Sequence, residues 1–258
     1  MTQPDNPFTA PGGPTPPVPG NLPVAAPVDP AAPPVPAYAH GVPPYGQPPL
    51  RSAAGLGVAA IVLACAWTVV QVLRLAFAPQ AAEALRAASD AGQGALASAF
   101  TGYDAIGLLY VPLQLAAFVV TCLWLYASRT TAEAADPSFV HARGRVWVWL
   151  GWVVPVVSFW FPYQVVRDTR RATATRILGG VGGWWAAWLV FLTVSNAVGR
   201  MNLRTTPEAA AIAADGLVPL EVVATVAMIV ALVLWIRIVR DITRAQAERI
   251  AATSATSY

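Results

Sequence analysis

The chain has 258 residues, of which 56% are apolar and only 11% charged, and its formal net charge at pH 7 is +3. Because soluble domains carry about 25% charged residues, this composition excludes a soluble fold. The chain contains no lysine, so all 16 basic residues are arginines and enzymes that use a catalytic lysine are also excluded.

Residues 1–50 form a proline-rich segment that holds 17 of the 24 prolines and only two charged residues, Asp5 and Asp29. Such a segment buries too little apolar surface to offset its ordering entropy and favours extended polyproline II conformations. It also lacks the basic start and apolar core of a signal peptide. We expect a disordered cytosolic arm that acts as a tether or binds a cytosolic protein with a proline-binding groove.

Membrane-spanning helices are predicted from uncharged stretches, because a helix needs roughly 20 residues to cross about 30 Å of hydrocarbon. Glu221 is the one charge in the last of these stretches, near its start. We expect an all-α polytopic helical membrane bundle over residues 51–245, followed by a short cytosolic tail over 246–258. The four predicted spans cover about residues 53–76, 104–128, 177–199 and 217–239.

Residues 146–166 are uncharged and long enough to span, but they contain Pro155, Pro162 and four tryptophans. Pro155 interrupts the hydrogen-bond ladder of a helix near its middle, which membrane-embedded backbone tolerates only where other groups satisfy the freed atoms. Two topologies follow. This Trp/Pro-rich stretch is either a re-entrant or interfacial element beside four spans, or a fifth span.

The distribution of arginines favours four spans, because positive residues concentrate on the cytosolic side. With four spans and a cytosolic N-terminus, the inside holds Arg51, seven arginines between 129 and 176, and four between 237 and 249. The outside then holds three arginines, namely Arg86, Arg200 and Arg204. Five spans invert this distribution. Four spans also place Trp124, Trp184, Trp185 and Trp235 near the cytosolic helix ends, where interfacial tryptophans are common.

The loops predicted on the outer side contain residues that are typical of short helices. Thr206, Pro207 and Glu208 resemble an N-cap followed by a first helical turn, and Gly216 resembles a stop, so a short separate helix is predicted between them. Residues 79–98, which start at Pro79 and are rich in alanine, predict another.

A group of polar residues lies at the outer ends of the predicted spans. Ionisable side chains at this depth cost a few kcal/mol unless they are paired or hydrated. Arg74 can pair with Glu221 or Asp104, and the group then lines a vestibule or a small-ligand site. Alternatively, each side chain reaches the headgroups separately. The members are Gln71, Arg74, Asp104, Ser195, Asn196 and Glu221.

A second group combines the Trp/Pro element with the basic segment that follows it. At helical spacing Arg167 and Arg171 share a face, and Asp168 can reach Arg171. This basic platform suits anionic lipids of the inner leaflet or an acidic partner, although ordinary positive-inside anchoring explains it too. The candidate binding residues are Trp149, Trp152, Pro155, Trp160, Pro162, Tyr163, Gln164, Arg167, Asp168, Arg170 and Arg171.

The sequence contains few residue patterns that are typical of catalytic or metal sites. The two histidines, His40 and His141, and the two cysteines, Cys65 and Cys122, have no metal-ligand spacing. The glycine-rich stretch 179–183 lacks the Lys-Ser/Thr that a phosphate loop needs. We therefore expect a protein that is not an enzyme, with no catalytic residues, cofactor or metal and with no nucleic-acid partner.

Three runs of the sequence resemble a known family. They are FVVTCLWLYASRTTAEAA at 118–135, WLGWVVPVVSFWFPYQVVRDTRRAT at 149–173 and WWAAWLVFLTVSNAVG at 184–199. Together they are similar to the domain of unknown function 4328 family of bacterial membrane proteins, and the composition is of actinobacterial type. The resemblance implies a proline-rich cytosolic arm and an aromatic and proline core before a basic helix. Ser158 stands where that core has asparagine. The family supplies no activity.

The leading hypothesis is a multi-pass protein of the bacterial plasma membrane with both termini in the cytosol. It organises anionic lipid or a cytosolic partner through the basic helix that follows the Trp/Pro element. The alternative is a small transporter or channel-like module in which the outer polar group lines a path, since helix breaks at membrane depth are typical of transport sites.

Overall fold

The computed structural model describes residues 52–173 and 179–255, so the arm predicted for residues 1–50 lies outside the described residues. Within the described part the secondary structure is entirely helical, which confirms the expected all-α class. The α-helices are α1 (Ala54–Asp90), α2 (Gly102–Gly107), α3 (Tyr110–Ala135), α4 (Trp147–Val153), α5 (Phe161–Thr173), α6 (Val181–Met201) and α7 (Pro207–Ala255). Two short 3₁₀ helices are η1 (Ala95–Ala97) and η2 (Val157–Phe159).

Four helical segments are long and apolar enough to cross a membrane, as the sequence predicts. They are α1, α2 together with α3, α6, and α7. Residues 146–166 do not form a spanning helix, because helix α4 ends at Val153 and is followed by the separate helices η2 and α5. The four-span fold is therefore confirmed, and the chain is a membrane-embedded protein.

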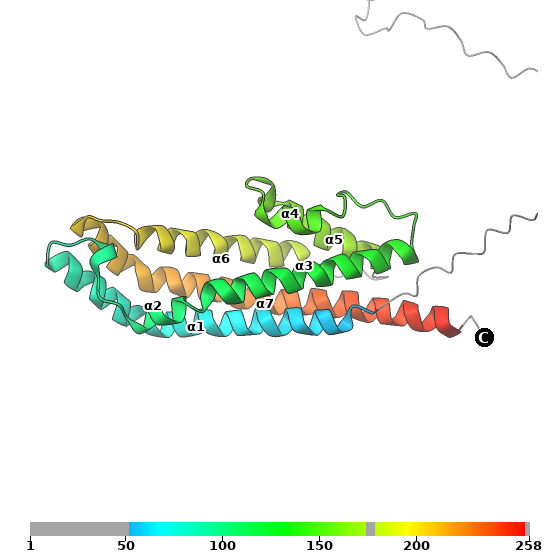
Figure 1. Ribbon diagram of the computed structural model, residues 1–258, viewed down its shortest axis with the longest axis horizontal. Helices are drawn as coiled ribbons and strands as arrows, with labels where there is room; N and C mark the ends of the chain where they lie inside the picture. Colours follow the sequence, from blue (N-terminus) through cyan, green and yellow to red (C-terminus); the bar gives the residue numbers. More distant parts are fainter. Residues whose placement is uncertain (1–51, 174–178, 256–258) are drawn as a thin grey trace, which may run out of the picture. The chain divides into compact units, whose positions relative to one another are not determined.

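Helices α1 and α7 lie side by side along the bundle, with α3 packed on α1 and α6 packed on α7 (Figure 1). Alanines face each other where α1 and α7 meet, including Ala78 and Ala82 of α1 and Ala210 and Ala213 of α7. Small side chains let two helices approach closely. Gly57, near the start of α1, also allows close packing, because a Cβ there would lie 3.0 Å from Nε1 of Trp124.

Both central helices are longer than the sequence predicts. The short helices expected at 79–98 and after Thr206 are continuous with the spans, so α1 runs through Pro79 and α7 runs through Gly216 and Pro219. A proline or glycine weakens a helix locally, but packing of neighbouring helices overrides such a cost. The alanine-lined contact between α1 and α7 supplies that packing here.

The two ends of the bundle differ in chemistry. We call the end formed by α5, the C-terminal part of α3 and the C-terminal part of α7 the arginine end, and the opposite end the loop end. Several tryptophans pack together toward the arginine end. The ring of Trp184 stacks on that of Trp235 with 5.2 Å between centroids, and Trp124 contacts Trp235 edge to face at 5.5 Å. Trp152 of α4 lies 6.4 Å from Trp184 and 6.1 Å from Trp185, ring to ring.

Candidate functional site

The α4–α5 unit, residues 147–173, lies against the bundle toward its arginine end (Figure 1). Helix α4 stops at Val153, and Val156 adopts φ 67°, a left-handed backbone that β-branched residues rarely take. Pro155 precedes it and has no N–H to continue a helix. The predicted break at Pro155 therefore exists, and it reverses the chain into η2 and α5.

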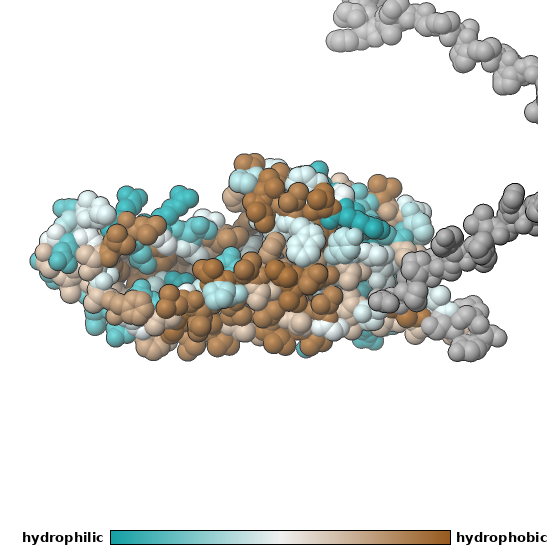
Figure 2. All heavy atoms as spheres, in the orientation of Figure 1, coloured by the Kyte–Doolittle hydropathy of each residue, from teal (hydrophilic) through white to brown (hydrophobic). Residues whose placement is uncertain are grey.

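The outward surface of this turn is apolar. Five large side chains are between 42% and 66% exposed, and Figure 2 shows apolar side chains gathered over α4 with hydrophilic ones nearby. Scattered apolar residues on a surface are ordinary, but a continuous group indicates contact with lipid or protein. We call this group the apolar turn, and it consists of Leu150, Val153, Val156, Phe159 and Trp160.

Polar contacts fix the inner side of the unit to the spans. The indole N–H of Trp185 on α6 donates to the Phe159 carbonyl at 2.7 Å. The Cys122 thiol on α3 donates to the Val148 carbonyl at 3.3 Å. Because both side chains come from spanning helices, the apolar turn is held in one position on the bundle.

The arginines of α5 divide into a buried one and two that face outward. Arg170 is buried and its Nη2 lies 2.6 Å from Oδ2 of Asp241 on α7, so its charge is neutralised inside the protein. Arg167 is partly exposed, while Arg171 is exposed. Only part of the predicted basic platform is therefore available to a ligand.

Asp168 does not pair with Arg171, contrary to the expectation from helical spacing. Its Oδ1 lies 3.0 Å from Nη2 of the adjacent Arg167, and its Oδ2 accepts a hydrogen bond from the Ala142 N–H at 2.9 Å. The preceding loop therefore determines the direction of this carboxylate. A rule based on helix spacing considers only residues of the same helix and does not predict a contact with a distant part of the chain.

The aromatic and amide residues at the start of α5 carry further cationic contacts. The guanidinium of Arg143 lies 3.9 Å from the ring centroid of Phe161, and its Nε donates to the Gln164 side chain at 2.7 Å. Arg167 lies 5.5 Å from the Tyr163 ring. Cation–π contacts of this kind orient arginine side chains on a surface.

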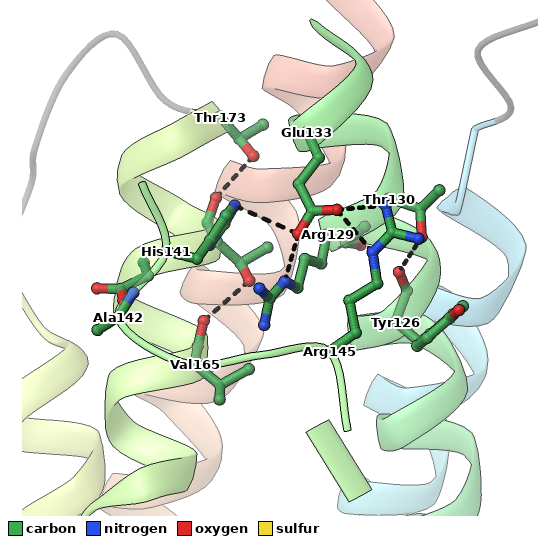
Figure 3. A network of polar contacts seen from close by, with 12 residues as sticks. Tyr126, Arg129, Thr130, Glu133, His141, Ala142, Arg145, Val165 and Thr173 are labelled. Atoms are coloured by element: carbon green, nitrogen blue, oxygen red, sulfur yellow. Dashed lines mark hydrogen bonds and ion pairs between the residues drawn. The ribbon is translucent and has the colours of Figure 1, made fainter. Parts of the chain in front are cut away.

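A polar network that the sequence analysis did not predict joins α3 to the loop before α4. Figure 3 shows Arg129, Arg145 and His141 directed toward the carboxylate of Glu133. The Glu133 oxygens lie 2.7 Å from Nε of Arg129 and 2.5 Å from Nη2 of Arg145, and 3.9 Å from Nε2 of His141. Burial, together with the positive charge of Arg129, lowers the pKa of His141. We call these four residues the glutamate network.

One part of the network has a signal in the sequence, since Arg129 and Glu133 are four residues apart on a helix. The contributions of His141 and Arg145 depend on the path of the loop. Arg145 remains about half exposed although it is paired, so it adds a third outward-facing arginine to the arginine end.

At the loop end, three of the six predicted polar residues belong to one compact cluster, and the other three lie outside it. Glu221 is 2% exposed and accepts hydrogen bonds from the Tyr103 hydroxyl and from Nε2 of Gln71, the latter at 2.6 Å. Nη2 of Arg74 lies 3.2 Å from Oε1 of Glu221 and also contacts the Tyr103 hydroxyl. Thr225 completes what we call the buried polar cluster, 3.3 Å from Gln71.

Three of the six predicted members lie outside this cluster. Asp104 caps α2, accepting hydrogen bonds from the N–H of Thr101 at 2.8 Å and from its hydroxyl at 2.7 Å. Asn196 is exposed and donates to the Leu192 carbonyl of its own helix. Ser195, also on α6, is half-buried. Arg74 therefore pairs with Glu221 and not with Asp104, whose position at a helix start gives it a capping role.

Comparison with protein families matches residues 91–244 to the family described as domain of unknown function (DUF4328). The chain belongs to this family. The match confirms the resemblance stated above, and it contains the whole α4–α5 unit, the glutamate network and Arg200, whereas Gln71 and Arg74 precede it. No curated protein and no solved structure matches the chain.

Proposed function

We propose that this member of the domain of unknown function 4328 family is a non-enzymatic protein of the bacterial plasma membrane that organises anionic lipid of the inner leaflet around its α4–α5 unit. One observation carries the proposal: the exposed apolar turn and the outward-facing arginines of α5 belong to one unit that hydrogen bonds hold against the spans. Apolar side chains in the acyl region with arginines at headgroup level are the usual pattern of interfacial elements.

The orientation follows from charge. The arginine end holds the residues of α5, the glutamate network and the C-terminal part of α7, while the loop end has few arginines. Because arginines concentrate on the cytosolic side, we place the arginine end and both termini in the cytosol. The apolar turn then meets the inner leaflet, whose anionic lipids attract basic residues.

The expected selectivity is modest. Each net positive charge near an anionic surface contributes about 1 kcal/mol. Arg171 has no ion-pair partner among the described residues, whereas Asp168 offsets Arg167 and a single carboxylate, Glu133, is shared by Arg145 and Arg129. The net charge of about two therefore supplies about 2 kcal/mol. That is roughly a thirtyfold preference for an anionic over a neutral lipid surface. Arg170 adds nothing to this sum, since Asp241 neutralises it.

Transport is the alternative function, and the charged pair Arg74 and Glu221 at membrane depth is the observation that favours it. The dense mutual contacts of the buried polar cluster support a structural role instead, because they tie α1 and α2 to α7. A double Arg74→Ala, Glu221→Ala variant that folds but loses uptake or efflux of a solute in vesicles would favour transport.

The test of the leading proposal is lipid co-purification. Full-length protein extracted in mild detergent carries anionic and zwitterionic lipids whose ratio is measured by mass spectrometry. Arg167→Gln with Arg171→Gln should lower that ratio at least fivefold. Arg244→Gln is the matched control, because this exposed arginine lies in the C-terminal part of α7 and pairs with Glu248.

A second pair of variants tests the apolar turn. Leu150→Ser with Trp160→Ser, two exposed residues of the apolar turn, should also lower the lipid ratio, since the turn would no longer hold the arginines at headgroup level. An unchanged ratio in both double variants contradicts the proposal. If the lipid ratio is unchanged but a soluble acidic protein is lost from the α5 surface, the basic face serves a cytosolic partner instead.

A further inference from the structure

A long groove lies between α3 and α6, because these helices pack mainly on α1 and α7 respectively. Its volume is about 1030 Å³, at the upper limit of about 1,000 Å³ for pockets that hold drug-sized ligands. Its lining on α6 extends from Trp184 to Arg200, a distance of about 24 Å at 1.5 Å per residue. The groove therefore exceeds one leaflet, which is about 15 Å of hydrocarbon.

The walls of the groove are apolar over most of this length. Trp67 of α1 and Met228 of α7 line its floor, and six indoles contribute to the lining in all. The end toward the arginine end is closed by Trp152 and Phe159 of the α4–α5 unit. A hydrocarbon chain fits such a surface, because it offers apolar contact without polar partners.

The other end of the groove is polar and positively charged. Gln114, Asn196 and Arg200 all line it there, and all three are exposed. Arg200 is the one charged residue of the lining, and among the described residues no ion pair engages it. An arginine fork with free donors beside amide groups recognises phosphate or carboxylate.

We infer that this groove binds one anionic lipid, with its chain lying along the aromatic wall and its headgroup held by Arg200 at the loop end. A second copy of the protein fits less well, because an apolar helix in the groove would cover Arg200 without supplying an opposite charge. The leaflet assignment rests on the orientation proposed above and places this headgroup in the outer leaflet. The site shares Trp152 and Phe159 with the α4–α5 unit, but its headgroup position at Arg200 lies at the opposite end and does not depend on the arginines of α5.

The test uses the groove tryptophans as reporters. Lipids with brominated chains quench indole fluorescence on contact, so full-length protein in detergent micelles is titrated with brominated phosphatidylglycerol or with brominated phosphatidylcholine of the same chains. A Trp160→Phe background removes the exposed indole of the apolar turn. We expect saturable quenching by phosphatidylglycerol at about tenfold lower concentration than by phosphatidylcholine.

Two matched pairs of variants locate the site. Arg200→Gln should raise the phosphatidylglycerol concentration needed about tenfold, while Arg204→Gln, an exposed arginine of the same end outside the lining, should leave it unchanged. Ala64→Phe fills the groove and should abolish saturable quenching. Val62→Phe, on the same helix but outside the lining and 58% exposed, should not.

Two results overturn the inference. In the first, both lipids quench equally, and neither Arg200→Gln nor Ala64→Phe changes the quenching. This result means that only bulk lipid contacts the tryptophans. Loss of all quenching on dimer formation, with intermolecular cross-links from α3 to α6, means that a second copy occupies the groove. Neither result depends on Arg167 or Arg171, so this inference and the proposed function can fail separately.

Discussion

Individual charges in this protein follow two patterns. Arg170 and Glu221 are buried and each meets an opposite charge within 3.2 Å or less. Arg171 and Arg200 are exposed and free of such partners among the described residues. Buried charges require a partner because desolvation costs several kcal/mol per ion, whereas exposed ones are available to ligands.

Arg170→Ala should destabilise the protein by about 2 kcal/mol, because it removes a charged hydrogen bond to the partly exposed Asp241 and a donor from the Gly179 carbonyl. Thermal unfolding of the purified protein measures the change. Arg171→Ala, one residue away and exposed, is the control and should shift the midpoint little. Equal midpoints for the two variants would show that the Arg170 ion pair contributes nothing.

Arg74 and Glu221 should be energetically coupled. Each single alanine variant leaves the other charge buried and unpaired, so the double variant should be less destabilised than the sum of the two by about 1–3 kcal/mol. A double-mutant cycle on thermal unfolding gives this value. Strict additivity would mean that the two charges reach the headgroups separately.

His141 should make the arginine end sensitive to acid. Its folded-state pKa is lowered below the ordinary value of 6.5 by burial and by Arg129, while Glu133 and Asp168 act in the opposite direction. The unfolded chain therefore binds the proton first, and stability that is full above pH 6.5 is lost as the pH falls through the folded pKa. The unfolding midpoint of the native protein should fall more between pH 7.5 and 5 than that of His141→Gln. Parallel pH profiles would exclude this role of His141.

At the scale of elements, the break after α4 distinguishes this fold from a five-span protein. The break combines a proline with a residue at positive φ, and it is stabilised by contacts of Phe159 and Val148 with the spans. Positive φ at a β-branched residue costs of order 1 kcal/mol. The turn is therefore held by tertiary contacts against a local preference.

Val156→Gly should raise the unfolding free energy by about 1 kcal/mol, because glycine adopts φ 67° without strain. Val153→Gly is the matched control: this residue is similarly exposed but helical, so glycine there should destabilise by about 1 kcal/mol. Thermal unfolding of both variants decides the matter, and a loss of stability in Val156→Gly would contradict the assigned backbone strain.

The sequence predicts the spans well because length and absence of charge are local properties. It predicts the ends of α1 and α7 poorly, since Pro79, Gly216 and Pro219 signal breaks that the packing of the two helices overrides. Propensity is a weak guide where neighbouring helices supply the stabilising contacts.

The candidate sites are predictable in residue type but not in partnership. Arg170 meets Asp241 from 71 residues away, and Glu221 meets Gln71 from 150 residues away. No spacing rule covers such distances. The sequence therefore indicates which charges require partners, whereas the fold decides which charges remain free.

At the scale of the whole bundle, the protein presents different surfaces at its two ends. The arginine end carries the apolar turn and outward cations, and the loop end carries Arg200 at the mouth of an apolar groove. The proposed function requires the arginine end to face the cytosol. That orientation is the central claim, because both the inner-leaflet role and the leaflet of the groove lipid follow from it.

Labelling with a membrane-impermeant thiol reagent tests the orientation directly. Val140→Cys at the arginine end and Leu203→Cys at the loop end are 88% and 68% exposed in the native side chains, and each is made with Cys65 and Cys122 replaced by alanine. We predict that Leu203→Cys is labelled on intact cells, and that Val140→Cys is labelled only after the cells are opened. Labelling of Val140→Cys on intact cells would place the arginine end outside and contradict the proposed function.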